Sequence, residues 1–145
     1  MILLDANLLL YAYNKSFPQQ ARARAWLEEV LSKSAPVGLP WTTLLAFVRI
    51  STNPQAFPEP LSIDEATSIV SELLDHPTVV IPEPPDTHWD TMRTLLMTMR
   101  VRGPEVMDAH LAALALGHGA TLCSTDRGFA RFRGVRLLNP LEERA

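Results

Sequence analysis

The chain has 145 residues, of which 47% are hydrophobic and 20% are charged. This balance predicts one compact domain over residues 1–145 and excludes an intrinsically disordered chain, which would be poor in aliphatic residues and highly charged. The formal net charge of −3 gives the molecule as a whole no attraction to nucleic acids or anionic membranes, and the single cysteine, Cys123, excludes an intramolecular disulfide framework.

The sequence also lacks the signals of a membrane protein. No apolar run approaches the ~20 residues that a membrane-spanning helix needs. Asp5 interrupts the apolar stretch at the N-terminus and no basic residue precedes it, so a signal peptide is not expected. Together with the lone cysteine, these features favour a soluble protein of the reducing cytoplasm.

The apolar pattern predicts short strands that alternate with helices. In chain order, we expect a strand at 2–4, helices at 7–13 and 16–32, an extended segment at 36–40, helices at 41–50 and 62–74, a strand at 78–81, helices at 86–99 and 104–117, a strand at 120–124, a short helical turn at 127–132 and a strand at 135–138. This alternation predicts an α/β domain with a short, mainly parallel β-sheet flanked by helices.

Three of the predicted helices carry more specific signals. The segment 41–50 is apolar nearly all round, so we expect it to be buried. Ser62 and Glu65 have the spacing of a capping box at the start of their helix. Asp86 is expected to cap the helix that follows it.

Four carboxylates stand out from the solvated surface charges: Asp5, Glu105, Asp108 and Asp126. Asp5 follows the first predicted strand, and Asp126 comes just after a later one. Because parallel strands present their carboxyl ends at one edge, where ligands of open α/β sheets bind, both residues are expected at that edge. Glu105 and Asp108 are three residues apart in the first turn of a helix, so both project from one of its faces.

Crowded carboxylates are tolerated when a cation neutralises them. Mg²⁺ and Mn²⁺ are the natural candidates because they prefer oxygen ligands. The amide of Asn7 and the hydroxyls of Ser124 and Thr125 are placed to orient a ligand or a water molecule. A pair of such ions would activate a water and stabilise the leaving oxygen of a phosphodiester.

A purely structural role fits the same residues. Asp5 and Asp126 each precede a helical segment and are suitable N-caps, and Glu105 complements the positive end of a helix dipole. The residues by themselves leave both interpretations open.

Three segments resemble the PIN-domain family: Ile2-Leu-Leu-Asp5-Ala-Asn7, Val106-Met-Asp108-Ala-His110 and Ser124-Thr-Asp126-Arg-Gly-Phe129. Their order and spacing span nearly the whole chain and are similar, more narrowly, to VapC-type toxin ribonucleases of bacterial toxin–antitoxin pairs. The resemblance implies a metal-dependent endoribonuclease in which Asp5, Asp108 and Asp126 bind the metal. It also implies an RNA substrate, a cognate VapB-like antitoxin that blocks the site, and a homodimer.

The sequence departs from this family at two positions. Phe47 stands where the family carries a Glu in the helix after the second strand, and Gly128 stands where many relatives carry a second Asp after Arg127. Both departures make the expected site less acidic. Glu105 is our candidate for the missing carboxylate, and we expect it to assist catalysis from another helix.

Three arginines are candidates for holding the RNA backbone. Arg127 and Arg131 belong to a basic strip directly after Asp126, and Arg49 interrupts an otherwise apolar helix. Phosphate contacts of this kind make binding strongly salt dependent. The alternative for the strip is a solvated surface, while Arg49 either pairs with the acidic cluster or emerges at the end of its helix.

The sequence therefore predicts a PIN-like domain that hydrolyses RNA through a water activated by Mg²⁺ or Mn²⁺. Two other interpretations stay open. One is a PIN-like RNA-binding module that is weakened in catalysis, which Phe47 favours. The other is a metal-dependent DNA nuclease or phosphohydrolase.

Overall fold

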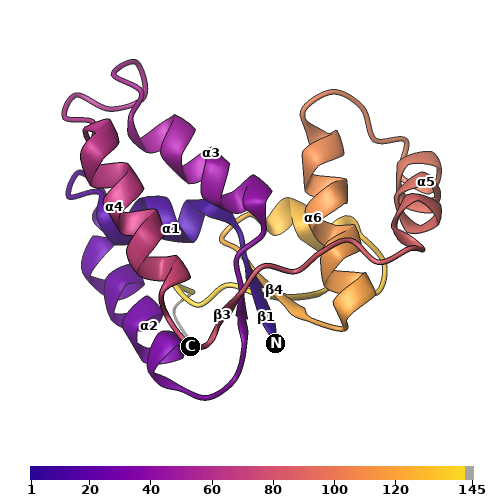
Figure 1. The fold of residues 1–145 in the computed structure, drawn as a ribbon. Helices are drawn as coiled ribbons and strands as arrows, with labels where there is room; N and C mark the ends of the chain where they lie inside the picture. Colours follow the sequence, from indigo (N-terminus) through magenta and orange to yellow (C-terminus); the bar gives the residue numbers. More distant parts are fainter. Residues whose placement is uncertain (143–145) are drawn as a thin grey trace.

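The computed structural model, described here for residues 1–142, has a parallel five-stranded sheet between two layers of helices (Figure 1). In chain order the elements are β1 (Ile2–Leu4), α1 (Ala6–Tyr13), α2 (Gln20–Ser32), β2 (Val37–Gly38), α3 (Trp41–Ser51), α4 (Ile63–Leu74), β3 (Val79–Val80), α5 (His88–Thr98), α6 (Glu105–His118), β4 (Thr121–Cys123), the 3-10 helix η1 (Arg127–Arg131) and β5 (Arg136–Leu138). This architecture confirms the predicted fold class. The last residues of the expected domain, 143–145, lie outside the described part.

The sheet has the order β3-β2-β1-β4-β5, so β1 lies at its centre. Beyond the strand ends, the Asp5 N–H donates to the Cys123 carbonyl at 2.9 Å, and the Ser124 N–H donates to the Leu138 carbonyl at 3.0 Å. These bonds continue the parallel pairing by one residue. They bring Asp5 and Ser124 side by side at the carboxyl edge of the sheet.

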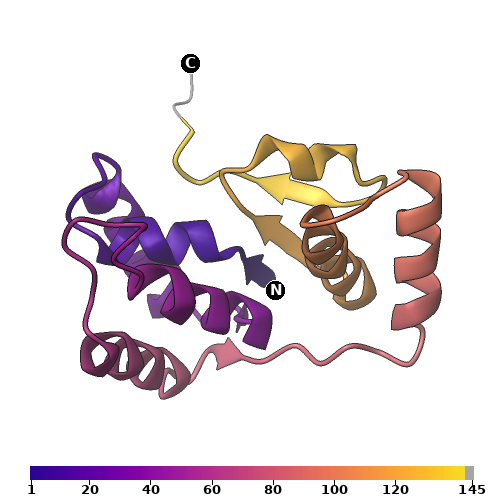
Figure 2. The ribbon, with the colours of Figure 1, turned by 90° about the horizontal axis from the view of Figure 1, so that it is seen from above.

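Each face of the sheet carries its own hydrophobic core because successive strand residues point to opposite faces. Leu4 packs into a cluster with residues of α1 to α4, whereas Leu3 packs into a cluster with residues of α5 and α6. Figure 2 shows α1 to α4, in indigo to magenta, on one side of the sheet and α5 and α6, in orange shades, on the other.

The helix predicted at 41–50 is present as α3, but the prediction that it is buried is wrong. Leu44 and Phe47 of α3 are buried, but Trp41 is 48% exposed and Leu45 is 62% exposed. The helix packs mainly on α1 and α4. Leu45 lies on the side of α3 that lines a cavity, so it remains in contact with solvent.

The two predicted helix caps have different outcomes. The capping box is confirmed, since the Glu65 N–H donates to Ser62 Oγ at 3.0 Å and the Ser62 N–H donates to Glu65 Oε1 at 3.1 Å. Asp86 is not a cap, because α5 begins only at His88 after a turn in which the His88 N–H bonds to the carbonyl of Pro85. In the described part of the chain, every helix is too short or too polar to span a lipid bilayer.

Candidate active site

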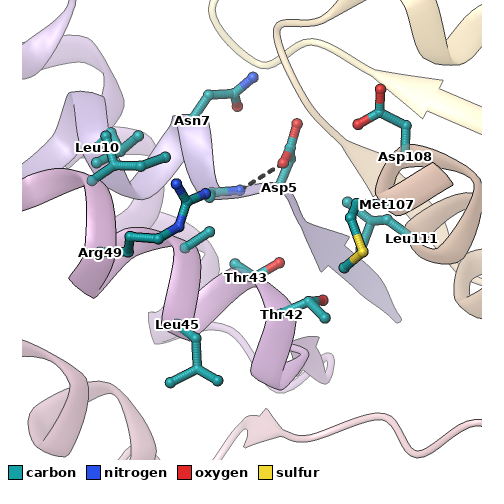
Figure 3. A pocket seen from close by; sticks show the side chains of 13 residues that line it. Asp5, Asn7, Leu10, Thr42, Thr43, Leu45, Arg49, Met107, Asp108 and Leu111 are labelled. Atoms are coloured by element: carbon teal, nitrogen blue, oxygen red, sulfur yellow. Dashed lines mark hydrogen bonds between the residues drawn. The ribbon is translucent and has the colours of Figure 1, made fainter. Parts of the chain in front are cut away.

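A cavity of about 710 Å³ opens beside the carboxyl edge of the sheet, between α3 and α6. Asp5 and Asn7 reach it from the end of β1 and the start of α1, and Asp108 reaches it from the first turn of α6. The carboxylates of Asp5 and Asp108 point toward each other across the cavity (Figure 3). The structure therefore brings together two of the predicted acidic residues.

Both oxygens of the Asp5 carboxylate accept hydrogen bonds. Oδ1 accepts from the Ala6 N–H at 2.8 Å, which makes Asp5 the N-cap of α1, and Oδ2 accepts from the Ser124 hydroxyl at 2.7 Å. Burial raises the pKa of Asp5 above its usual value, and the charge of Asp126 adds to this, while the two hydrogen bonds act in the opposite direction. Asp5 therefore does act as a helix cap, and its hydrogen bonds hold the carboxylate in a fixed orientation.

Ser124 connects the polar groups of this edge. It is 1% exposed, and its hydroxyl oxygen accepts from Asn7 Nδ2 at 3.2 Å and from the Asp126 N–H at 3.0 Å while donating to Asp5. Asn7 Oδ1 is buried and has no hydrogen-bond partner within residues 1–142. This carbonyl oxygen is therefore available to a water, a ligand or a cation.

Asp108 is half-buried, and burial also raises its pKa. The negative charges of Asp126, Asp5 and Glu105 raise this pKa further, while Arg131 lowers it. These effects place the other three acidic side chains within electrostatic reach of Asp108. Within residues 1–142, however, no three His, Cys, Asp or Glu side chains lie close enough to form a metal-binding group by themselves.

Asp126 and Glu105 lie outside the cavity lining. Asp126 is exposed and caps η1, because its Oδ1 accepts from the Gly128 N–H at 2.8 Å. Glu105 pairs with Arg131 at 3.3 Å, and the guanidinium of Arg131 also lies over the Phe132 ring at 4.8 Å. Glu105 thus faces an arginine in this structure, and its influence on Asp108 is electrostatic.

Phe47 is a core residue. It is fully buried in the cluster of α1 to α4, with its ring 5.8 Å from that of Tyr13. The face of α3 that lines the cavity includes Thr42, Ala46 and Arg49. The departure from the family at position 47 therefore lies on the core side of α3, away from the carboxylates.

The remaining predicted residues lie in different surroundings. Arg49 is exposed, lines the cavity and has no ion pair within residues 1–142, so the structure shows no pairing with the acidic cluster. Arg127 points to solvent and contacts Glu142 at 3.5 Å. Thr125 is half-buried and lies outside the cavity lining.

The apolar part of the cavity was not predicted from the sequence. It is formed by Leu10, Leu45, Ala46, Ile50, Met107 and Leu111. Apolar residues at helical spacing are typical of a core, so the pattern concealed them. One indication of this lining was present in the sequence, because Met107 directly precedes Asp108.

Comparisons with known proteins agree with this fold. The sequence profile of the PIN domain matches residues 2–135. VapC ribonuclease Mb2897 of Mycobacterium bovis is 39% identical over 142 residues, which cover 98% of this chain and 97% of that protein. The crystal structure of Mycobacterium tuberculosis VapC20, a sarcin–ricin loop cleaving toxin, is similar with a TM-score of 0.68 at 16% identity, over 94% of this chain and 99% of that one. A toxin–antitoxin complex from Klebsiella pneumoniae is similar with a TM-score of 0.64 at 16% identity, over 97% and 98% of the two chains.

Proposed function

Because this chain belongs to the PIN-domain family, we propose that it is a metal-dependent endoribonuclease that acts as the toxin of a toxin–antitoxin pair. The observation that carries the proposal is the facing pair of carboxylates, Asp5 and Asp108, in a cavity at the carboxyl edge of a parallel sheet. The ribonuclease relative, which matches almost the whole of both chains, supports RNA as the substrate.

A hydrated Mg²⁺ or Mn²⁺ ion fits the polar end of this cavity. Two half-buried carboxylates with raised pKa values face each other there, and the Asn7 carbonyl oxygen beside them has no hydrogen-bond partner among residues 1–142. Mg²⁺ is commonly held by one or two carboxylates, with waters and substrate phosphates as its other ligands, so a preformed cage of three side chains is not required. A bound divalent cation lowers the pKa of a coordinated water and neutralises charge that develops on the phosphate.

The protein's own groups position this chemistry. Asp5 and Asp108 would hold the ion, and Asp126, the third predicted ligand, would at least add negative charge from the start of η1. Ser124 and Asn7 fix the orientation of Asp5, and Thr125 orients a water beside them. Glu105 assists by strengthening the negative potential at Asp108.

Arginines around the site hold the RNA backbone. Arg49 is exposed at the cavity, and Arg127 and Arg131 lie on η1, next to Asp126. Because phosphate neutralisation releases counterions, binding through these residues is expected to weaken steeply as salt rises.

The proposed partners follow from the same family. A VapB-like antitoxin would block the cavity, as the similarity to a toxin–antitoxin complex supports. We also propose that the toxin forms a homodimer and acts in the cytoplasm, where its RNA substrates are.

The experiment is cleavage of labelled total RNA by the purified, antitoxin-free protein, with and without Mn²⁺ or Mg²⁺. We expect metal-dependent cutting that Asp5→Asn abolishes, with circular dichroism of the variant showing an intact fold. A folded wild-type protein that binds RNA but never cuts it would favour the RNA-binding module weakened in catalysis. Cutting of DNA in place of RNA would favour the DNA nuclease.

A further inference from the structure

The cavity at the proposed active site has two unlike ends. Asp5, Asn7 and Asp108 make one end polar, whereas α3 and the neighbouring part of α6 line the other with apolar side chains (Figure 3). Leu45 is 62% exposed and Met107 is 54% exposed, although both line this cavity. Apolar side chains that remain exposed in a cavity beside catalytic groups indicate a surface that a ligand covers.

A single cation, Arg49, lies in this apolar lining. It follows Leu45 by one helical turn, is exposed, and has no ion pair within residues 1–142. In Figure 3 its side chain lies between Leu10 and Leu45, on the α3 side of the cavity. A guanidinium group stacks on flat aromatic rings, so the lining suits an aromatic group better than an aliphatic one.

We propose that the apolar end is a nucleobase subsite. The base next to the scissile phosphate leaves the RNA stack and lies between Arg49 and the apolar side chains of Leu45, Ala46 and Met107. This inference rests on the proposed endoribonuclease function and adds which part of the RNA selects the cut. The cavity of about 710 Å³ has room for a nucleotide, since small-molecule sites typically measure ≈ 300–1,000 Å³.

A nucleobase fits these observations better than an apolar segment of a protein partner. Its phosphate is covalently tied to it and would lie at the polar end, where the cation-binding carboxylates are. The base itself offers Arg49 a π-face, whereas an aliphatic side chain would leave the guanidinium covered and unpaired. The two ends of the cavity thus match the two ends of one nucleotide.

The test uses the RNA sites that the wild-type protein cuts. Short synthetic RNAs that contain one mapped cleavage site would be compared with otherwise identical RNAs. In these, an abasic ribose replaces the nucleotide on one side or the other of the scissile phosphate. Removing the base that occupies the subsite should lower kcat/KM on the order of tenfold, because stacking contributes ≈ 1–3 kcal/mol per base. Without added metal, the affinity measured by fluorescence anisotropy should also be lower for the RNA that lacks this base.

Two variants then ask whether this effect belongs to the subsite. Ala46→Phe fills the cavity from α3, and Leu45→Ala removes part of its wall, while both leave every carboxylate in place. In each variant, the difference in kcat/KM between normal and abasic RNA should be much smaller than in the wild-type protein. Met97→Ala is the matched control, because Met97 is 68% exposed on α5, outside the cavity lining, and its variant should behave as wild type.

The outcomes separate this inference from the function on which it rests. An abasic penalty that is equal in wild type, Ala46→Phe and Leu45→Ala would overturn the subsite, and so would the lack of any penalty in wild type. In either case metal-dependent cutting would leave the endoribonuclease function standing. A wild-type protein that cuts no RNA would overturn both. Leu45→Ala carries the test if Ala46→Phe fails to fold, since Leu45 is mostly exposed.

Discussion

The end of β1 and the first turn of α6 each present one carboxylate to the same cavity, and they support it differently. Asp5 at the end of β1 has both oxygens hydrogen-bonded and caps α1. The Asp108 carboxylate on α6 has no hydrogen-bond partner within residues 1–142 and is surrounded by other negative charges. One carboxylate is part of the framework, whereas the other is held in place only by its helix. The roles that we propose for them in catalysis are equal, whereas their roles in folding are unequal.

The largest expected effect is a loss of RNA cleavage, and it should follow from replacing either carboxylate. Asp5→Asn and Asp108→Asn should each lower RNA cleavage on the order of 10³-fold, as the loss of a group that stabilises transition-state charge does. Initial rates on a labelled RNA at saturating Mn²⁺ would measure this. A variant that retained more than a tenth of the activity would remove its residue from the catalytic set.

A smaller loss of activity should follow when a group that hydrogen-bonds to Asp5 is removed. Ser124→Ala removes the hydroxyl that donates to Asp5 Oδ2, so we expect cleavage to fall about 10- to 100-fold, as is typical when groups that orient metal ligands are removed. A metal titration of activity should show a raised requirement for Mn²⁺. Ser71→Ala is the control and should leave activity unchanged, because Ser71 is exposed on α4 and lies outside the cavity lining. Wild-type activity of Ser124→Ala would mean that α1 alone orients Asp5.

The two carboxylates should differ in how much their replacement changes the stability of the fold. Burial and neighbouring charges raise the pKa of Asp108, so the folded state holds a proton there more readily than the unfolded state. The resulting destabilisation is fully present at neutral pH and disappears once the pH falls below the unfolded pKa. Asp108→Asn should therefore stabilise the metal-free protein by roughly 0.5 kcal/mol at pH 7, a small gain because the side chain is only half-buried.

Burial raises the pKa of Asp5 as well, so Asp5→Asn also removes a charge that opposes folding. Because the amide replaces one of two hydrogen-bonded carboxylate oxygens, we expect its change in stability to be about 1 kcal/mol less favourable than that of Asp108→Asn. Urea denaturation of both variants at pH 7 and at acidic pH would measure the difference. A gain in stability from Asp5→Asn as large as that from Asp108→Asn would refute the contrast between the two regions.

The smallest expected effect concerns Glu105. Its carboxylate is half exposed and paired with Arg131, so Glu105→Gln should weaken Mn²⁺ binding only about two- to fivefold, within the range of a surface ion pair. Isothermal titration calorimetry with Mn²⁺ would test this. Unchanged metal affinity would exclude Glu105 from the acidic site, whereas a loss as large as that of Asp108→Asn would make it a ligand.

Several residues that end strands or begin helices were predictable from the sequence, although Asp86 was not. Asp5 and Ser124 were expected at one edge, and the structure joins them by a hydrogen bond. Ser62 and Glu65 form the expected capping box. These predictions succeeded because each depends on contacts within a few residues or on the common direction of parallel strands.

Predictions that depended on which face of a helix is covered did less well. The exposed side of α3 at Leu45 and the pairing of Glu105 with Arg131 both arise from neighbours that are distant in the sequence. Position 47 illustrates the same point, because Phe47 turned out to pack in the core behind the cavity wall.

The sequence by itself determined the alternation of strands and helices, the edge at which Asp5 lies, and the family to which the chain belongs. These properties follow from hydrophobic period, capping chemistry and motif spacing, all of which are local or one-dimensional. Only the tertiary structure decided that Asp108 faces Asp5 across a cavity whose other end is apolar. That arrangement depends on how α3 and α6 pack beside the sheet, and a helix with apolar residues on several faces does not specify which of them its neighbours will cover.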